Sequence, residues 1–251
     1  MQKALITGAS GGIGRELAIL MAVAGHDLVL VARSKDELQK VQSLLEKKSD
    51  SKVSIYPIDL SKTGAAKKLY DHYKNSGIEI LINNAGVGLK GDFFNDDPAK
   101  TVAIAQLNMI SLMELSQLFG RDFIKNDKGK ILNIASIAAF LPGPKQPVYY
   151  ATKSFVRELS RALSYNVRNT NVTVTVLHPG VTKTNFFVSS NAASVKGGAS
   201  PISVARTGYR AMMNGKTEVT HGLANKFLTN ILIRLVPSRY QAMLVDRGSE
   251  V

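Results

Sequence analysis

The chain has 251 residues, of which 45% are apolar, and it carries a formal net charge of +13 with no cysteine. This length fits one large α/β domain with a sizeable core, and the composition excludes a disordered chain. The absence of cysteine excludes disulfide bonds, a thiolate nucleophile and a Cys-ligated metal, and it agrees with a reducing, cytoplasmic location. We expect no metal site. Because the first strand-like run begins at Lys3, we also expect no leader peptide.

The positive charge would attract nucleic acid, anionic lipid or phosphorylated ligands. The lysines and arginines are spread along the whole chain, however, with no RNA-binding signature and no zinc-finger spacing. We therefore expect a generally basic surface and no nucleic-acid partner.

Apolar, β-branched runs alternate with segments of helical period along most of the chain. The runs that we interpret as strands are 3–7, 27–32, 53–58, 79–84, 130–136 and 171–177. The helix-length segments between them are 13–24, 35–48, 66–75, 98–125 and 147–168. Nearly continuous apolar strands are typical of strands covered on both faces, and β–α alternation implies a parallel sheet with right-handed crossovers. The sequence predicts a single doubly wound, Rossmann-type α/β domain over residues 1–251, with about seven strands and helices on both faces.

A glycine-rich turn, TGASGGIGRELA, follows the first strand directly and places Gly8, Gly12 and Gly14 at the start of a helix. Such a turn lets backbone N–H groups approach a pyrophosphate, which the helix N-terminus favours electrostatically. The alternative is a turn that only permits close packing of strand and helix. Its spacing, Gly-x-x-x-Gly-x-Gly, differs from the Gly-x-Gly-x-x-Gly of the common dinucleotide fold.

With Thr7 in front, this turn resembles the fingerprint of the classical short-chain dehydrogenase/reductase family, in its NADP-preferring type. Further motifs follow in the family's order and context, over a span from Lys3 to about Thr184. They are Asp59 after the third strand, NNAG at 83–86, Asn108 in the next long helix, Ser136 ending the fifth strand, Tyr149 with Lys153, and Pro179 with Gly180.

The resemblance implies a catalytic set made of Asn108, Ser136, Tyr149 and Lys153. It also implies a homodimer or homotetramer, paired through the helices that carry the tyrosine and the asparagine. The positions that it assigns to the nicotinamide cofactor are Thr7, Gly8, Ser10, Gly11, Gly12, Ile13, Gly14, Arg33, Ser34, Asp59, Leu60, Asn84, Ala85, Gly86, Tyr149, Lys153, Pro179, Gly180, Thr182 and Thr184.

Tyr149 is the expected general acid or base. A free tyrosine has a pKa of about 10, and a nearby lysine ammonium and an oxidised nicotinamide would both lower it toward neutrality. Ser136 would bind the substrate oxygen and stabilise its developing charge. The resemblance implies that Asn108 holds a water that links Lys153 to solvent. The alternative for Asn108 is a buried amide that only satisfies backbone groups.

Two neighbours of this set have weaker claims to a catalytic role. On a helical wheel Tyr149 lies roughly 40° and Tyr150 roughly 60° from Lys153, so geometry does not choose between the tyrosines. Only Tyr149 completes Tyr-x-x-x-Lys, which leaves Tyr150 for the pocket edge or a subunit contact. We interpret His178, at the end of a strand, as a structural residue.

The end of the second strand indicates which cofactor is bound. Enzymes that prefer NAD usually place an acid there, whereas this chain has Ala32, Arg33 and Ser34. Ser34 and Glu37 have the spacing of a helix capping box. We expect Arg33 and Ser34 to receive a 2′-phosphate, with Arg15 as a second cation, and hence NADP rather than NAD. The alternative is a pair of solvated surface arginines.

Apolar residues are expected to line the substrate pocket, namely Ala138, Phe140, Leu141, Phe186 and Phe187. They favour a small-molecule ketone, aldehyde or secondary alcohol of apolar character as the substrate of an NADP-dependent oxidoreductase. One alternative is a 3-oxoacyl-[acyl-carrier-protein] reductase, for which a basic surface would suit an acidic carrier. An alternative of another class is a non-catalytic nicotinamide-sensing regulator.

Residues 185–251 are expected to hold a substrate loop and a basic, apolar C-terminal segment. The small, polar stretch 189–201 is interpreted as a flexible lid. The apolar run 227–236 is interpreted as an amphipathic helix packed on its own domain, with peripheral membrane contact through 227–247 as the alternative. No apolar run approaches the roughly 20 residues that span a bilayer.

Overall fold

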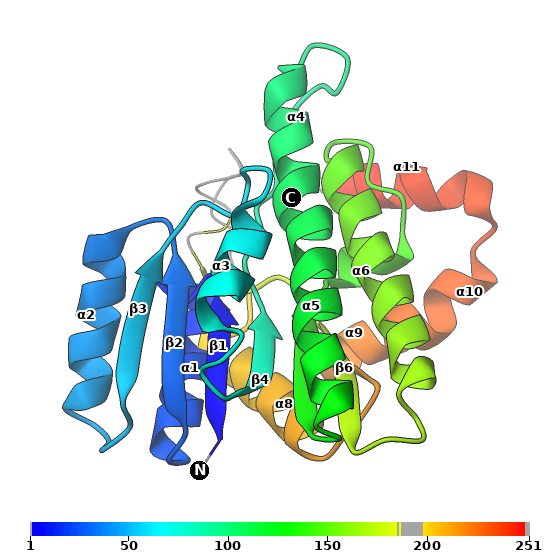
Figure 1. Ribbon diagram of the computed structural model, residues 1–251. Coiled ribbons are helices and arrows are strands. Elements are labelled where there is room, and N and C mark those ends of the chain that lie inside the picture. The colour runs from blue at the N-terminus through cyan, green and yellow to red at the C-terminus, as the bar shows by residue number, and fades with distance from the viewer. Residues whose placement is uncertain (1, 185, 187–197, 249–251) are drawn as a thin grey trace.

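The computed structural model describes residues 2–184, 186 and 198–248. Among these residues, seven strands form one parallel sheet in the order β3-β2-β1-β4-β5-β6-β7 (Figure 1). The strands are β1 (Lys3–Thr7), β2 (Asp27–Ala32), β3 (Val53–Pro57), β4 (Ile78–Asn83), β5 (Gly129–Ile134), β6 (Val172–His178) and β7 (Glu218–Thr220). This order, with the first strand at the centre, confirms the predicted doubly wound fold.

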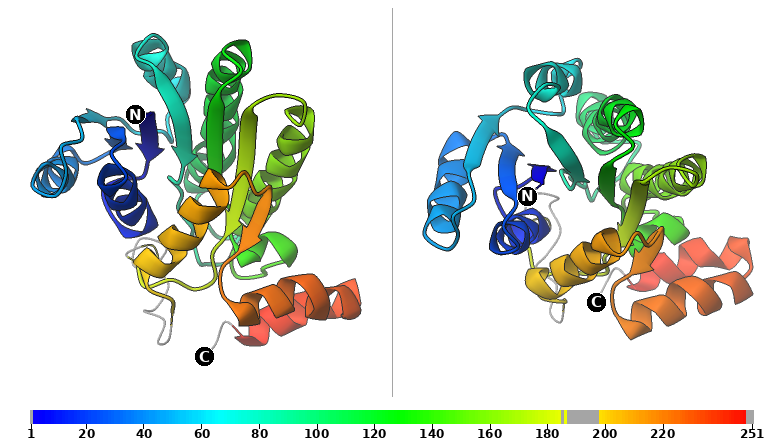
Figure 2. Two further views of the ribbon diagram at one scale, coloured as in Figure 1. Left: turned by 90° about the horizontal axis from the view of Figure 1, so that it is seen from below. Right: turned by 60° about the horizontal axis from the view of Figure 1, so that its bottom comes forward.

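Helices cover both faces of the sheet (Figure 2). One face carries α1 (Gly12–Val23), α2 (Lys35–Glu46) and α8 (Pro201–Met213). The other face carries α3 (Ala65–Tyr73), the continuous run α4 (Pro98–Ala105), η1 (Gln106–Ser111) and α5 (Leu112–Lys125), and then α6 (Pro147–Asn166). A short 3-10 turn, η2 (Ile137–Phe140), follows β5. The sheet is therefore buried on both sides, as its apolar strands predict.

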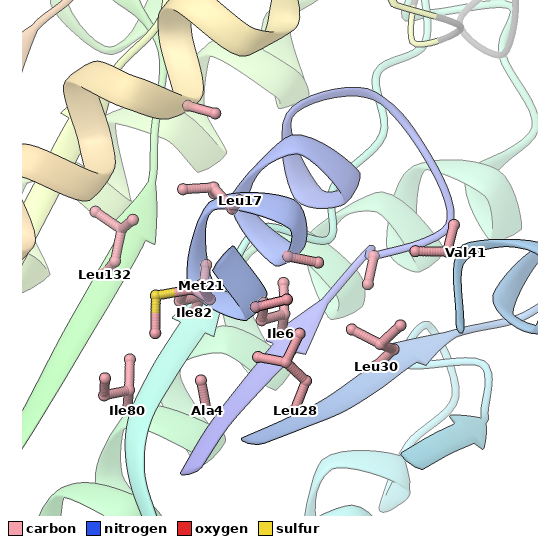
Figure 3. Packing of buried hydrophobic residues seen from close by; sticks show 14 of the residues in the cluster. Ala4, Ile6, Leu17, Met21, Leu28, Leu30, Val41, Ile80, Ile82 and Leu132 are labelled. Carbon is pink, nitrogen blue, oxygen red and sulfur yellow. The ribbon is translucent and has the colours of Figure 1, made fainter. Parts of the chain in front are cut away.

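The central strand, β1, contributes alternate apolar side chains to the hydrophobic clusters on the two faces of the sheet. Ala4 and Ile6 of β1 pack with Met21 of α1 in one cluster, seen in Figure 3. Leu5, between them, packs with Phe119 of α5 in the opposite cluster. Successive side chains of a strand point to opposite faces, so a strand covered on both sides is apolar at every position.

Helix starts follow the capping signals of the sequence. Ser34 Oγ accepts a hydrogen bond of 3.3 Å from the backbone N–H of Glu37, as the capping-box spacing predicts. Asp97 accepts from the N–H of Ala99 at 2.9 Å, and Pro98 occupies the first turn of α4. Each cap satisfies one N–H that the helix itself leaves unpaired.

The long helix from Pro98 to Lys125 differs from expectation in two ways. Its turn η1, which carries Asn108, is π-helical, a geometry that often marks functional positions. By length and composition alone, the same 28-residue run is the one helix among the described residues that could cross a membrane, so the expectation that no run reaches this length was wrong. Phe119 and Phe123 of this helix are fully buried in the core on one face of the sheet.

The C-terminal part forms a helical hairpin at the side of the molecule (Figures 1 and 2). Its first arm is α9 (Leu223–Phe227), η3 (Leu228–Leu232) and α10 (Ile233–Leu235), and its second arm is α11 (Ser238–Gly248). The expectation that 227–236 packs on its own domain was wrong for Phe227, Ile231, Leu232 and Leu235, which are all exposed. The lid predicted at 189–201 lies mostly outside the described residues.

Candidate active site

A crevice of about 610 Å³ opens at the carboxyl ends of the strands, where open α/β sheets bind ligands. Most of the predicted site residues line it: Gly8, Ser10, Gly11, Gly12, Ile13, Arg33, Ser34, Asp59, Leu60, Asn84, Ala85, Gly86, Ser136, Tyr149, Lys153, Pro179, Gly180, Thr182 and Thr184. Thr7, Gly14 and Asn108 do not line the crevice, and their contacts hold the crevice wall from behind.

The glycine turn has one closed side and one open side. A side chain at Gly14 would collide with the carbonyl oxygen of Gly8, and a Cβ at Gly8, where φ is +67°, would lie 2.7 Å from the Asn84 amide nitrogen. At Gly11, by contrast, a Cβ would meet nothing within 4 Å. On the closed side, Gly8 and Gly14 allow the strand end and the helix to pack closely. On the open side, the backbone N–H groups at the start of the helix fit a pyrophosphate.

Hydrogen bonds of Thr7 and Asn84 join the glycine turn after β1 to the residues that follow β4. The Thr7 hydroxyl accepts from the N–H groups of Asn84 and Ala85, each at 3.0 Å. In return, the Asn84 side-chain amide donates to the carbonyls of Thr7 at 3.0 Å and Gly8 at 3.1 Å. Side chains therefore pair the backbone groups that the sheet leaves free at this switch point.

Ser136, Tyr149 and Lys153 meet on the opposite wall. Ser136 follows β5 and its side chain caps η2, while Tyr149 and Lys153 lie on successive turns of α6. The side chain of Ser136 lies near the Tyr149 phenol and acts to lower its pKa. The Lys153 Nζ lies 5.7 Å from the centre of the Tyr149 ring and donates to the Ile134 carbonyl at 2.9 Å.

The pKa of Tyr149 moves in the direction opposite to the expected one. Burial raises it to about 12, and the side chain of Ser136 opposes that rise only in part. Burial also lowers the pKa of Lys153 to about 8. Lys153 does not offset the burial of Tyr149 because its nitrogen is bound to the Ile134 carbonyl rather than to the phenol. The pair thus holds a neutral phenol, which is a proton donor, beside a lysine that titrates near neutral pH.

Asn108 binds the backbone just after the NNAG motif. Its Oδ1 accepts from the N–H of Val87 at 3.0 Å, and its Nδ2 donates to the Val87 carbonyl at 2.8 Å and to Thr152 at 3.1 Å. A Cβ at Gly86 would lie 3.3 Å from both Asn108 Oδ1 and Lys153 Nζ. These bonds are those of a structural amide, and the predicted water link to Lys153 stays a prediction.

The far end of the crevice holds Arg33, Ser34 and Asp59. Burial works to raise the pKa of Asp59, but hydrogen bonds from Ser61 and the charge of Arg33 leave it below its usual value. Arg15, expected here as a second cation, instead pairs with Glu16 at 2.8 Å and does not line the crevice.

The apolar wall is shorter than expected. Ala138 and Phe186 line the crevice, but Phe140 and Leu141 line a neighbouring hollow of about 480 Å³. Tyr150 lines both, which places it at the edge between them. Phe187 lies outside the described residues.

His178 is fully buried and has a structural environment. Its Nε2 lies 2.9 Å from Glu218 Oε1 and its Nδ1 lies 3.2 Å from the Ser136 carbonyl. Arg157 also donates to Glu218, at 2.9 Å. The hydrogen bond from His178, followed by that from Arg157, lowers the pKa of Glu218 to about 2 against the effect of burial. Both ring nitrogens of His178 are therefore engaged behind the site rather than within it.

Sequence reasoning missed several residues at or beside the crevice, among them Gln146 and Asn225. Gln146 lines the crevice, and its position one helical turn before Tyr149 and Tyr150 was a usable signal. Asn225 of α9 packs so tightly on Gly180 that any side chain at position 180 would collide with it. No local pattern connects these two segments.

Comparison with known proteins agrees with this geometry. The model of the short chain dehydrogenase family matches residues 2–194. The 17-beta-hydroxysteroid dehydrogenase type 3 of Mus musculus is 34% identical over 71% of this chain and 59% of its own length. The very-long-chain 3-oxoacyl-CoA reductase of Homo sapiens is 32% identical over 77% of this chain and 61% of its own. The match thus spans about three-fifths of these relatives.

Two solved structures extend over almost the whole chain. A short-chain dehydrogenase from Sphingobium yanoikuyae, in complex with NADPH, has a TM-score of 0.85 at 26% identity and covers 100% of this chain and 95% of its own. The bulky-bulky ketone specific alcohol dehydrogenase of Comamonas testosteroni has a TM-score of 0.81 at 25% identity, with coverage of 100% and 93%. Fold, motif order and sequence match agree, and the chain belongs to the short-chain dehydrogenase family.

Proposed function

We propose that this protein is an NADP-dependent oxidoreductase that exchanges a hydride between the nicotinamide and a carbonyl or secondary alcohol of a small, apolar substrate. The observation that carries this proposal is the meeting of Ser136, Tyr149 and Lys153 on one wall of the crevice. The open glycine turn lies in the same crevice.

Side chains of the protein transfer the proton to and from the substrate oxygen. A reduced nicotinamide, when bound, supplies the hydride. Tyr149, neutral because its pKa is about 12, donates its proton to the substrate oxygen, and Ser136 donates a hydrogen bond to that oxygen as its negative charge develops. Once the phenolate forms, the Lys153 ammonium, which lies 5.7 Å from the centre of the ring and has a pKa of about 8, is drawn toward it and returns a proton near neutral pH. In the reverse direction Tyr149 accepts the proton.

Arg33 supports NADP as the cofactor. It is exposed at the rim of the crevice and forms no ion pair with any residue in the described part of the chain. No acid ends β2, and the nearby carboxylate of Glu37 is paired with Lys40 at 2.7 Å. A guanidinium that forms no ion pair suits a 2′-phosphate, and the Sphingobium structure is a complex with NADPH.

The cofactor preference is tested by titrating the protein with NADPH and NADH. We expect the Arg33→Ala variant to lose about tenfold to a hundredfold in NADPH affinity, with little change for NADH. Arg15→Ala is the matched control, since Arg15 pairs with Glu16 outside the crevice. Equal affinity of the wild type for both cofactors, or a preference for NADH, contradicts the proposal.

The catalytic assignment is tested with the two adjacent tyrosines. We expect Tyr149→Phe to lower turnover of a carbonyl substrate with NADPH by about 10² to 10⁴, because Ser136 acts on this phenol and not on that of Tyr150. Tyr150→Phe should largely retain turnover. Equal NADPH affinity in both variants shows that each site is intact, and the reverse pattern of activity overturns the assignment.

A second candidate is a reductase of 3-oxoacyl thioesters. It is supported by the name of the human relative, which is 32% identical, and by the basic surface, which would suit an acidic acyl carrier. A panel with NADPH that contains an acetoacetyl thioester, simple ketones, aldehydes and a ketone with two bulky apolar groups separates these candidates. Tight NADPH binding without hydride transfer to any of them would instead indicate a nicotinamide-sensing regulator.

We also propose a homodimer or homotetramer that pairs through α5 and α6. Closed homo-oligomers are the usual assemblies of soluble enzymes, and Met113 of α5 and Tyr165 of α6 are exposed apolar side chains on these helices. Light scattering on the wild type and on a Met113→Glu/Tyr165→Glu variant tests the interface, and a monomeric wild type contradicts it.

A further inference from the structure

The C-terminal hairpin, α9 to α11, exposes a row of large apolar side chains. Leu223 is 84% exposed and Leu235 is 74% exposed, at the two ends of the first arm. The complete set on the hairpin is Leu223, Phe227, Ile231, Leu232, Leu235, Tyr240, Met243 and Leu244. Positions 223, 227, 231 and 235 recur every four residues, and 240, 243 and 244 have helical spacing too, so each arm carries an apolar stripe. Contiguous exposed apolar surface marks a contact site.

The hairpin is well tied together. The side-chain amide of Gln241 on α11 donates to the carbonyls of Ile233 at 3.2 Å and Val236 at 3.0 Å. Thr229, which is buried, donates to the Asn225 carbonyl at 2.9 Å. Two polar side chains of the hairpin, Gln241 and Thr229, are thus bonded to its backbone, while eight of its large apolar side chains are exposed.

The charges on the hairpin are mostly positive. From 223 to 248 the sequence has Lys226, Arg234, Arg239 and Arg247, against a single acid, Asp246. The Asp246 carboxylate lies 3.4 Å from Lys145, outside the hairpin. Lys226 and Arg239 are exposed and form no ion pair within the ranges that the structure describes. The surface is therefore apolar and cationic.

We infer that this hairpin docks on the surface of an acidic lipid bilayer. Amphipathic helices with apolar side chains and nearby lysine or arginine lie in the interface of such membranes, where both the buried apolar area and the attraction to anionic headgroups contribute. A second copy of this chain is a poorer occupant of this surface, because a symmetric contact would set Lys226 and Arg239 of one hairpin against the same cations of the other.

Docking through the hairpin would bring the crevice close to the bilayer. Asn225 of α9 packs on Gly180 in the crevice wall, and Asp246 of α11 pairs with Lys145, just before the helix of Tyr149. An apolar substrate dissolved in the membrane would then be near its site. This last step rests on the proposed function, whereas the docking itself does not.

The inference is tested by sedimentation of the full chain with vesicles of phosphatidylcholine alone or mixed with phosphatidylglycerol. We expect the wild type to bind the mixed vesicles at least about tenfold more strongly than the neutral ones, and binding to fall as salt rises. Leu235→Ser/Leu244→Ser should lower binding to the mixed vesicles about tenfold or more. Lys226→Gln/Arg239→Gln should remove most of the preference for acidic lipid.

The matched control is Val23→Ser/Ile124→Ser, which removes two apolar side chains of similar exposure on α1 and α5. It should bind vesicles as the wild type does. Unfolding temperature and NADPH affinity, measured on every variant, show that each is folded and that the crevice is intact. Absence of vesicle binding by the wild type overturns the inference, as does equal loss in the control. A change of oligomeric state in the hairpin variant, with no vesicle binding, identifies the surface as a contact between copies.

Discussion

The strand-end crevice and the C-terminal hairpin use side chains in opposite ways. In the crevice wall, polar groups such as Thr7, Asn84 and Asn108 are turned inward and bonded to backbone atoms of neighbouring elements. On the hairpin, large apolar side chains such as Leu223 and Leu235 are turned outward. The side chains of the crevice wall thus suit contacts within the protein. The exposed side chains of the hairpin suit contacts with another surface.

This difference separates two kinds of sensitivity to mutation. A change in the crevice wall disturbs packed neighbours or leaves a buried partner unpaired, so it costs folding free energy. A change on the outward side of the hairpin touches little that is part of the fold, so its effect should be on docking. The following substitutions test this division.

The largest effect is expected at Gly14. A methyl group there would collide with the Gly8 carbonyl, which is backbone and cannot move aside. We expect Gly14→Ala to lower the free energy of unfolding by about 3 kcal/mol or more, or roughly 6–12 °C in unfolding temperature. Gly11→Ala, whose Cβ meets nothing within 4 Å, should change stability little. Similar stability of the two variants would show that the turn is not rigid.

A smaller loss is expected at Asn108. In Asn108→Ala, both the N–H and the carbonyl of Val87 lose their side-chain partner. Leaving such groups unpaired costs about 1–3 kcal/mol each, and urea unfolding should show a total loss of about 3 kcal/mol. Asn108→Asp keeps the acceptor for the Val87 N–H but sets a second acceptor against the Val87 carbonyl at a fully buried position, so it should lose at least as much. Equal stability of Asn108→Ala and wild type would contradict the structural role.

A pH-dependent effect is expected at Glu218. Its pKa of about 2 in the folded protein lies below its ordinary value of 4.5, chiefly because His178 and then Arg157 donate to it. The stability that this ionised group contributes, at most about 3 kcal/mol, is therefore complete above pH 4.5 and is lost as pH falls toward 2. We expect Glu218→Gln to be less stable than wild type in urea at pH 7, with the difference shrinking as pH falls below about 5. A difference that stays constant over this range would mean that the charge of Glu218 is not involved.

The smallest effect on folding is expected on the hairpin. Leu235→Ser and Leu244→Ser, made singly, should each change the free energy of unfolding by less than about 0.5 kcal/mol, because both side chains are exposed. Thermal unfolding in the absence of lipid measures this. A loss comparable to that of Asn108→Ala would mean that another part of the protein covers these side chains.

Much of the fold could be predicted because its strands are buried on both faces. Runs such as Asp27–Ala32 are apolar at nearly every position, and both ends of this strand agree with the prediction. The strand β7 could not be found in this way. It has three residues, and its pairing with β6, Leu177 against Val219, is what makes it a strand. A three-residue segment has too short a pattern to predict a strand that depends on pairing with a distant part of the chain.

The positions of the site were easier to predict than its electrostatics. The spacing of Tyr149 and Lys153 identified the pair, and both lie on the crevice wall. The raised pKa of Tyr149 follows from burial, to which segments far along the chain contribute, such as Phe186, whose ring centre lies 5.3 Å away. Spacing within one helix carries no information about such burial. Adjacent residues of a helix do not usually face each other, so adjacency did not predict that Arg15 pairs with Glu16.

The contact between Asn225 and Gly180 has a consequence for engineering the protein. The glycine is confined by an amide from the C-terminal hairpin, since the atoms nearest to its missing side chain all belong to Asn225. Removing the chain after Thr220 would therefore delete part of the wall that shapes the Pro179–Gly180 turn. A protein shortened in this way to improve solubility would lose its exposed apolar side chains, but its crevice would be open on one side. Serine substitutions at the exposed apolar positions of the hairpin would keep Asn225 and the crevice wall in place.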